Sequence, residues 1–227
     1  MFDLDYSGIL QKLAIFLVPG VFAITVHEVA HGWVAKKFGD RTAEQAGRLT
    51  LNPIKHIDPL GTIVLPLMLY SLGAPPFGWA KPVPVVFGNL DNPKRDMIFV
   101  AAGGPGANLV MATIWALLIA VLIYWVPVGG GGEFLYQMAR FGILINATLA
   151  MFNMLPIPPL DGGRVLSGLV PDRISAVLDR IEPFGLFLIF GLLILEYYTP
   201  VKLLSTYLLP LIDAVVLFFL ELAGVTR

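Results

Sequence analysis

The segment ILQKLAIFLVPGVFAITVHEVAHGWVAKKF, residues 9–38, decides how the rest of the chain is interpreted, because it is apolar enough to enter a membrane. Within it, His27 and His31 are four residues apart, so a helix places both imidazole groups on one face about one turn apart. Glu28 projects beside this pair. Two His with an adjacent Glu at this spacing form the pattern of a zinc hydrolase, in which the Glu takes a proton from water. Ionisable groups are costly inside a membrane, so a functional role is favoured over a chance match.

The composition indicates a polytopic membrane protein. Of the 227 residues, 57% are hydrophobic and 14% are charged, whereas soluble domains contain about 25% charged residues. The net charge of −1 argues against a nucleic-acid partner, because no basic surface is evident. The chain contains no cysteine, so it forms no disulfide or thiolate zinc site, and His, Asp and Glu remain as metal ligands. The N-terminus opens with Asp3 and Asp5, and no cleavable signal peptide is expected.

Apolar runs separated by turn signals predict five crossings of the membrane. Glycine and proline at residues 103–106 are expected to break one of these runs, so that its spanning helix begins at Ala107. The next run, residues 133–155, contains three polar residues that are unusual in a membrane span, Arg140, Asn146 and Asn153. Pro200 separates a closing helical pair. The expected crossings are residues 8–38, 107–126, 133–155, 184–198 and 201–222.

Two further segments are expected not to cross. The apolar run Leu60–Leu72 is about 20 Å long as a helix, short of the roughly 30 Å hydrocarbon core, which indicates a re-entrant or interfacial segment. Residues 74–88 are rich in Pro and Gly and cannot form a regular helix. Their proline-limited, extended character suits an edge strand or hairpin that offers backbone groups to another extended chain. A plain connecting loop is the alternative.

Basic residues predict the orientation, because positive charge concentrates on the cytoplasmic side of a membrane. Lysine and arginine are frequent in residues 36–95 and are absent from the turn at residues 128–132. Placing the basic stretches on the inside puts the N-terminus outside and the C-terminus inside. The exceptions Lys12, Arg140 and Lys202 lie near outer helix ends, where long basic side chains can snorkel. On this topology the His pair and a later Asp161 both lie toward the cytoplasmic face.

Asp161 is the best candidate for a third metal ligand. A catalytic zinc keeps three protein ligands and an open position, so His27 and His31 need one partner from elsewhere in the chain. Asp161 follows a prolyl break at the end of an apolar run, and Gly162 and Gly163 allow the backbone to turn close to a partner. Its alternative role is to cap a helix N-terminus. Weaker candidates, in ordinary loops, are Asp58, Asp91 and Asp172.

Four motifs occur together in this chain: HEVAH at residues 27–31, GWAKPVPV at 78–85, GGPGANL at 103–109 and FNMLPIPPLDGGR at 152–164. Together they resemble the site-2 protease family of intramembrane zinc metalloproteases, in particular its short bacterial members without a PDZ domain. The resemblance covers residues 8–166. No inserted PDZ-like or cystathionine-synthase-like domain is evident, so regulation through such a domain is not expected.

The resemblance implies roles for individual residues. In that family the His pair and the later Asp bind zinc, and the Glu is the general base; these roles fall on His27, His31, Asp161 and Glu28. An Asn that precedes the LPxxPxDGG run lies near the substrate carbonyl group in the family, and Asn153 matches it. The alternative for Asn153 is a hydrogen bond between helices.

The resemblance also implies a substrate-binding edge. The extended edge that pairs with an unwound substrate in the family corresponds to residues 79–86. The expected substrate-binding residues are Trp79, Lys81, Val83, Val85 and Asn153. His56 has no assigned role and is expected to be an interfacial loop histidine rather than a ligand, with control of access to the site as the alternative.

The sequence therefore predicts an all-α polytopic membrane protein with five to six transmembrane helices and a small β-hairpin or re-entrant loop near the active site. A catalytic core, residues 1–170, precedes a C-terminal helical pair, residues 171–227. The expected function is intramembrane zinc endopeptidase, with one Zn²⁺ per chain, in the cell (cytoplasmic) membrane, acting on transmembrane proteins. The alternatives are a zinc transporter and a non-catalytic protein that binds membrane helices.

Overall fold

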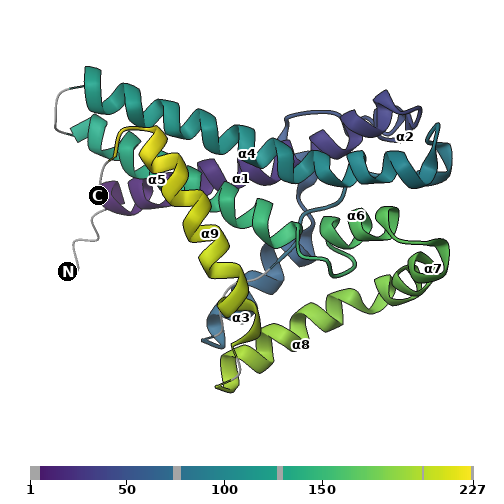
Figure 1. The fold of residues 1–227 in the computed structure, drawn as a ribbon. Coiled ribbons are helices and arrows are strands. Elements are labelled where there is room, and N and C mark those ends of the chain that lie inside the picture. Colours follow the sequence, from purple (N-terminus) through teal and green to yellow (C-terminus); the bar gives the residue numbers. More distant parts are fainter. Residues whose placement is uncertain (1–5, 74–77, 127–129, 201, 226–227) are drawn as a thin grey trace.

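The computed structural model describes residues 6–73, 78–126, 130–200 and 202–225, which form a bundle of helices (Figure 1). The α-helices are α1 (Tyr6–Lys37), α2 (Thr42–Gln45), α3 (Leu65–Ser71), α4 (Pro93–Trp125), α5 (Gly130–Asn153), α6 (Asp161–Leu169), α7 (Asp172–Ile181), α8 (Gly185–Tyr198) and α9 (Leu203–Leu222). Short 3₁₀ turns occupy Pro53–His56, Phe87–Asn89 and Glu182–Phe184, and a π-helical turn, Pro59–Val64, leads into α3. These described ranges contain no β-strand, so residues 78–85 do not form the expected edge strand or hairpin; residues 74–77 lie outside the described ranges.

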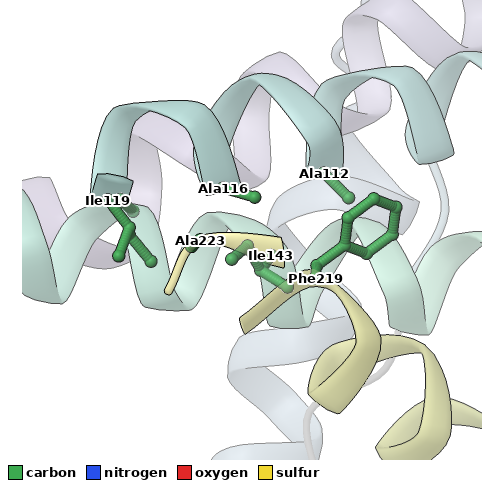
Figure 2. Close-up of a cluster of buried hydrophobic side chains, with 7 residues drawn as sticks. Ala112, Ala116, Ile119, Ile143, Phe219 and Ala223 are labelled. Atoms are coloured by element: carbon green, nitrogen blue, oxygen red, sulfur yellow. The ribbon is translucent and has the colours of Figure 1, made fainter. Parts of the chain in front are cut away.

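Three long helices, α1, α4 and α5, pack against one another at the centre of the bundle, and α9 packs against α5 and α4 (Figure 1). Small side chains on the facing surfaces, such as Ala112, Ala116 and Ala139, let the helix backbones approach closely. Larger side chains from α5 and α9, including Ile143 and Phe219, fill the space that remains (Figure 2). The helices are thus held by close packing, which is the main source of association where lipid replaces water.

The expected break at residues 103–106 does not occur, because α4 continues through Pro105. A proline inside a helix removes one backbone hydrogen bond and crowds the preceding turn. Both Gly104 and Pro105 are buried against neighbouring helices, and this packing maintains the helix through the proline. The neighbouring span also begins earlier than expected, at Gly130 rather than Glu133.

Among the described residues, three helices are long and apolar enough to cross a membrane: Leu10–Lys37 within α1, Pro93–Trp125 and Leu203–Leu222. The first of these contains the His pair. Helix α8 has 14 residues and is about 21 Å long, so it is too short to cross the roughly 30 Å hydrocarbon core alone. The structure therefore supports an all-α membrane protein, and five to six separate crossings do not follow from it. Residues 59–71 form a short apolar helical segment, as their length predicts.

The path of α8 and α9 differs from the expected topology. Helix α8 starts against the turn after α5, since a Cβ on Gly185 would lie 1.9 Å from the carbonyl oxygen of Pro158. Helix α9 ends beside α4, since a Cβ on Gly224 would lie 3.0 Å from the hydroxyl oxygen of Tyr124. Together the two helices make one passage along the bundle, and α9 ends at the same end of the bundle as the one where α1 begins (Figure 1). Counting α8 as a crossing is what placed the two termini on opposite sides of the membrane, and the side that each of them faces stays a prediction.

The buried carboxylate of Asp40 ties the end of α1 to a later loop. Its Oδ1 accepts hydrogen bonds from the backbone N–H of Thr42 (3.0 Å) and the side-chain amide of Asn89 (3.2 Å), and its Oδ2 accepts one from the backbone N–H of Val86 (2.7 Å). Burial by itself raises the pKa of Asp40, but these hydrogen bonds stabilise the charged form and lower the pKa below its ordinary value. The ionised form of Asp40 therefore contributes to stability.

We expect Asp40→Asn to lower the free energy of unfolding by about 1 to 3 kcal/mol at neutral pH, because the amide NH₂ would face a backbone donor. The lowered folded pKa means that the stabilisation by Asp40 is present above its ordinary pKa of 3.8 and is lost as pH falls through the folded pKa. Thermal unfolding in detergent at decreasing pH should thus show a shrinking difference between the variant and the natural protein. Glu133→Gln, at an exposed position, is the control; an unchanged midpoint for Asp40→Asn at neutral pH would contradict the assignment.

Candidate metal centre

Three side chains from two distant helices meet inside the bundle. On α1, His27 and His31 bring their Nε2 atoms to 3.0 Å from each other. Asp161, the first residue of α6, places its Oδ2 atom 3.3 Å from the Nε2 of His27 and 3.4 Å from the Nε2 of His31. The ligand atoms of all three lie within 4.8 Å of one another, and no other such group occurs among the described residues. The structure thus brings together the three residues that the sequence nominated as metal ligands.

The two glycines after Asp161 allow α6 to begin at this place. A Cβ on Gly162 would lie 2.2 Å from the carbonyl oxygen of Met154, and a Cβ on Gly163 would lie 2.5 Å from the nitrogen of Pro158. These distances are far below van der Waals contact, so any side chain at either position would push α6 away from the preceding turn. The glycines let the chain fold back on itself and direct the Asp161 carboxylate toward α1.

The main chain of α4 forms the opposite wall of the site. A Cβ on Gly104 would lie 2.3 Å from the Nε2 of His31 and 2.6 Å from the Cε1 of His27. The imidazole rings therefore lie directly over the backbone of α4. The sequence predicted a helix break at residues 103–106 and did not connect Gly104 with the His pair.

The hydrogen bonds of the imidazole rings leave both Nε2 lone pairs free. The Nδ1 of His31 is 2.7 Å from the carbonyl oxygen of Val100, which can only accept, so this Nδ1 carries the ring proton. The Nδ1 of His27 is 2.6 Å from the Oδ1 of Asn108. Two unprotonated Nε2 atoms then face the Oδ2 of Asp161, which is buried without a hydrogen-bond partner.

Such a convergence of lone pairs is unfavourable without a positive charge between them. A divalent cation satisfies all three ligand atoms, and a set of two imidazoles and one carboxylate with no thiolate suits zinc with an open position for water. The residues therefore fit a catalytic zinc ion. Carboxyl or carbonyl partners on the far side of the ligating His are the usual support for such a site.

Glu28 lies next to the His pair and is held by a residue distant in sequence. Its Oε2 accepts a hydrogen bond of 2.8 Å from the backbone N–H of Val83. Val83 is itself buried, and its side chain packs over α1, since a Cβ on Gly32 would lie 2.8 Å from the Cγ1 of Val83. The segment around Val83 thus fixes the direction of the carboxylate.

The extended segment, residues 78–86, is attached to the protein through alternate residues. The backbone N–H of Trp79 donates to the carbonyl oxygen of Gly61 (3.2 Å), and that of Lys81 donates to the carbonyl oxygen of His56 (2.9 Å). The carbonyl groups of Trp79 and Lys81 accept from Thr62 Oγ1 and Arg48 Nη2, each at 2.9 Å.

In an extended chain, successive residues direct their backbone groups to opposite sides. The backbone groups of Trp79 and Lys81, and the N–H of Val83, are used within the protein. The other edge remains for an added chain, and there Ala80 has an N–H and a carbonyl group, whereas Pro82 and Pro84 have carbonyl groups but no N–H. Of the expected binding residues, Trp79, Lys81 and Val83 therefore use backbone groups within the protein. The edge that contains Pro82 and Pro84 is called the proline edge below.

The other residues singled out from the sequence have the following positions. The side-chain amide of Asn153, in the last turn of α5, donates to the carbonyl oxygen of Leu149 in its own helix (2.9 Å). Its expected contact with a substrate stays a prediction. His56 is buried away from the three candidate ligands, with its Nε2 2.9 Å from the carbonyl oxygen of Thr50, and its backbone supports Lys81. His56 thus has a structural position in the loop that holds the extended segment.

Sequence reasoning did not single out Asn108, which touches His27 and is completely buried. The available signal was an amide side chain inside an apolar span, four residues after Gly104 on the same face of the helix.

Comparison with known proteins finds relatives over most of the chain. The model of peptidase family M50 matches residues 131–195. A protein of Bacillus subtilis named "Putative zinc metalloprotease YwhC" is 38% identical over 208 residues, which cover 90% of this chain and 89% of that protein. A protein of Mycolicibacterium smegmatis named "Putative zinc metalloprotease Rip2" is 31% identical over 84% of this chain and 70% of that protein. No solved structure matches the chain.

Gly104→Ala should weaken metal binding, because the added Cβ would occupy the space of the His31 ring. Overpacking of this kind costs about 1 to 3 kcal/mol in the free energy of unfolding or forces the rings to move. Gly106→Ala, on the same helix with no atom within 4 Å of the new Cβ, is the matched control and should bind zinc normally. Zinc content after purification and affinity in chelator competition provide the measurement. Equal affinity in the two variants would exclude the close contact between α4 and the rings.

Proposed function

Because the chain belongs to peptidase family M50, the site-2 protease family of zinc metalloproteases, we propose that it cuts peptide bonds within or next to transmembrane segments of other membrane proteins. The observation that carries the proposal is the meeting of His27, His31 and Asp161 inside a bundle of apolar helices, with Glu28 beside them. A peptidase site on an apolar helix lies within reach of polypeptides that are embedded in the membrane.

The proposed roles follow from the positions of the side chains. His27, His31 and Asp161 hold the zinc ion, which when bound lowers the pKa of a water molecule to about 7 and polarises a carbonyl group. Glu28 takes a proton from the attacking water and delivers it to the leaving amine. The hydrogen bond from Val83 occupies one oxygen of Glu28 and orients the carboxylate for this transfer.

Asn153 is proposed to donate a hydrogen bond to the carbonyl oxygen of the substrate as negative charge develops there. A contact of this type often contributes on the order of 3 kcal/mol to the transition state. The side-chain amide bonds to Leu149 O in its own helix, so a change of rotamer must free it before it reaches a substrate.

The substrate must be extended at the site, because a helical segment hides its amide groups in internal hydrogen bonds. We propose that the proline edge of residues 78–86 receives the unwound segment, with the carbonyl groups of Pro82 and Pro84 accepting N–H donors. An edge with acceptors and few donors favours a loose, exchangeable pairing over a full β-ladder. That property suits an enzyme that must release its products.

Transport of zinc is a weaker proposal. A conduction path needs several exchangeable sites across the bilayer. Among the described residues only one group of three metal-ligating side chains occurs, and it is compact. The same group with Glu28 at its side supports hydrolysis.

Cleavage of a reporter transmembrane segment in liposomes tests the proposal. Glu28→Gln should keep zinc and lose about 10²- to 10⁴-fold in rate, because the proton transfer is lost. Asp161→Ala should lose zinc together with activity. Asp172→Asn, at an exposed position outside the site, is the control and should retain both properties. Zinc-loaded natural protein that cuts none of several transmembrane segments, or an active Glu28→Gln variant, would refute the assignment.

Orientation is proposed from the basic residues at the end of the bundle that holds the metal centre, which include Lys36 and Lys37 in the last turn of α1. This end should face the cytoplasm, and the opposite end, where α1 begins and α9 ends, should face outward. The natural chain has no cysteine, so single introduced cysteines report sidedness without background. In intact cells, Lys55→Cys should resist an impermeant thiol reagent and Glu221→Cys should react. The reverse pattern would overturn the orientation, and equal reaction of both would contradict the passage of α8 and α9 through the bundle.

A further inference from the structure

A chain of buried amide groups connects His27 to two other helices. The Nδ1 of His27 lies 2.6 Å from the Oδ1 of Asn108 on α4. The Nδ2 of Asn108 donates to the carbonyl oxygen of Ala23 on α1 (3.2 Å) and to the Oδ1 of Asn146 on α5 (2.9 Å). The Nδ2 of Asn146 then donates to the carbonyl oxygen of Gly142 (2.8 Å). Both asparagines are fully buried.

Backbone carbonyl groups determine which way each amide points. The carbonyl oxygens of Gly142 and Ala23 can only accept hydrogen bonds. The NH₂ group of Asn146 must therefore face Gly142, which leaves its oxygen toward Asn108. In the same way the NH₂ group of Asn108 must face Ala23 and Asn146, which leaves its oxygen toward His27. A flipped amide at either position would place donor against donor or acceptor against acceptor between fully buried side chains.

The fixed amide of Asn108 in turn decides the tautomer of His27. A neutral imidazole carries its proton on one of its two nitrogens. With an acceptor opposite Nδ1, the proton lies on Nδ1 and the Nε2 lone pair points to His31 and Asp161. The other tautomer would place a proton on Nε2 and close that position to a metal ion.

We infer that Asn108 is a positioning residue of the metal centre, which holds His27 in the tautomer and ring orientation that binds zinc, and that Asn146 locks Asn108 in place. This inference rests on the proposed metal centre. The corresponding partner of His31 is the main-chain oxygen of Val100, which a substitution does not remove. Asn108 is therefore the side chain through which the support of the two rings can be tested.

A purely structural role would make a different prediction. The two amides also connect α1, α4 and α5 by hydrogen bonds. This structural role needs the donor groups of Asn108 as much as its acceptor. Asn108→Asp keeps an acceptor for His27 but loses both donors, whereas Asn108→Leu has a similar size and loses all three contacts. Positioning therefore predicts that zinc affinity separates the two variants. A purely structural role predicts that both variants lose stability and that zinc affinity does not distinguish them.

The experiment measures zinc affinity by chelator competition, and the visible absorption of the Co²⁺-substituted protein as a signature of ligand geometry, in the full chain in detergent. Asn108→Leu should bind zinc about 10- to 100-fold more weakly, the range typical for loss of such a supporting partner, and should show an altered Co²⁺ spectrum. Asn108→Asp keeps the acceptor but loses the donors that lock it, so its zinc affinity and Co²⁺ spectrum should lie between those of the natural protein and Asn108→Leu. Thr113→Val, which removes a hydroxyl group bonded to Leu109 O one turn further along α4, is the control and should change neither.

Zinc affinity of Asn108→Leu equal to that of the natural protein, or of Asn108→Asp as weak as that of Asn108→Leu, would overturn the inference. If Asn108→Leu does not fold, Asn108→Ala replaces it, because it also lacks the acceptor and cannot overpack the site. Absence of zinc binding in the natural protein would refute the proposed metal centre, and so differs from failure of the positioning role alone.

Discussion

The structure depends on the need to place a cation among three electron-pair donors inside an apolar bundle. Two imidazole nitrogens at 3.0 Å from each other and a buried carboxylate oxygen repel one another unless a positive ion lies between them. Every other feature of the centre brings these atoms together or supports them from behind. The helix bundle thus does in the membrane what a polar pocket does in a soluble enzyme, with main-chain groups as the principal supports.

The close packing of α1 against α4 and the turn before α6 both depend on a glycine at the point of closest approach. At Gly104 the absence of a side chain lets the imidazole rings lie on the backbone of α4, and at Gly162 it lets α6 begin against the turn after α5. The ligands come from two regions of the chain, α1 with both histidines and α6 with Asp161, which are more than a hundred residues apart. Their distances are nevertheless set by backbone contacts, which vary less than contacts between long side chains.

The sequence was sufficient to nominate the three candidate ligands that meet in the structure, and it was insufficient for the path of the chain. His27, His31, Glu28 and Asp161 were recognisable because their types and spacing belong to a known reaction. The break expected at residues 103–106 was wrong, since local propensity penalises Pro105 but packing against neighbouring helices outweighs that penalty. The path of α8 and α9 could not be predicted, because the end of α8 and its contact with Pro158 depend on tertiary packing. Asn108 escaped notice because a single amide in an apolar span does not indicate its partner.

The reliance of the centre on peptide groups affects how the protein tolerates mutation over time. Support from Val100 O and Val83 N–H survives any substitution at those positions that preserves the course of the backbone. Close to the ligands, the positions of α4 whose side-chain type matters directly therefore reduce to a very few, Gly104 and Asn108 foremost, apart from those that pack the helices together. The lipid-facing surface of the protein can therefore change in sequence while the side chains of the metal centre stay the same.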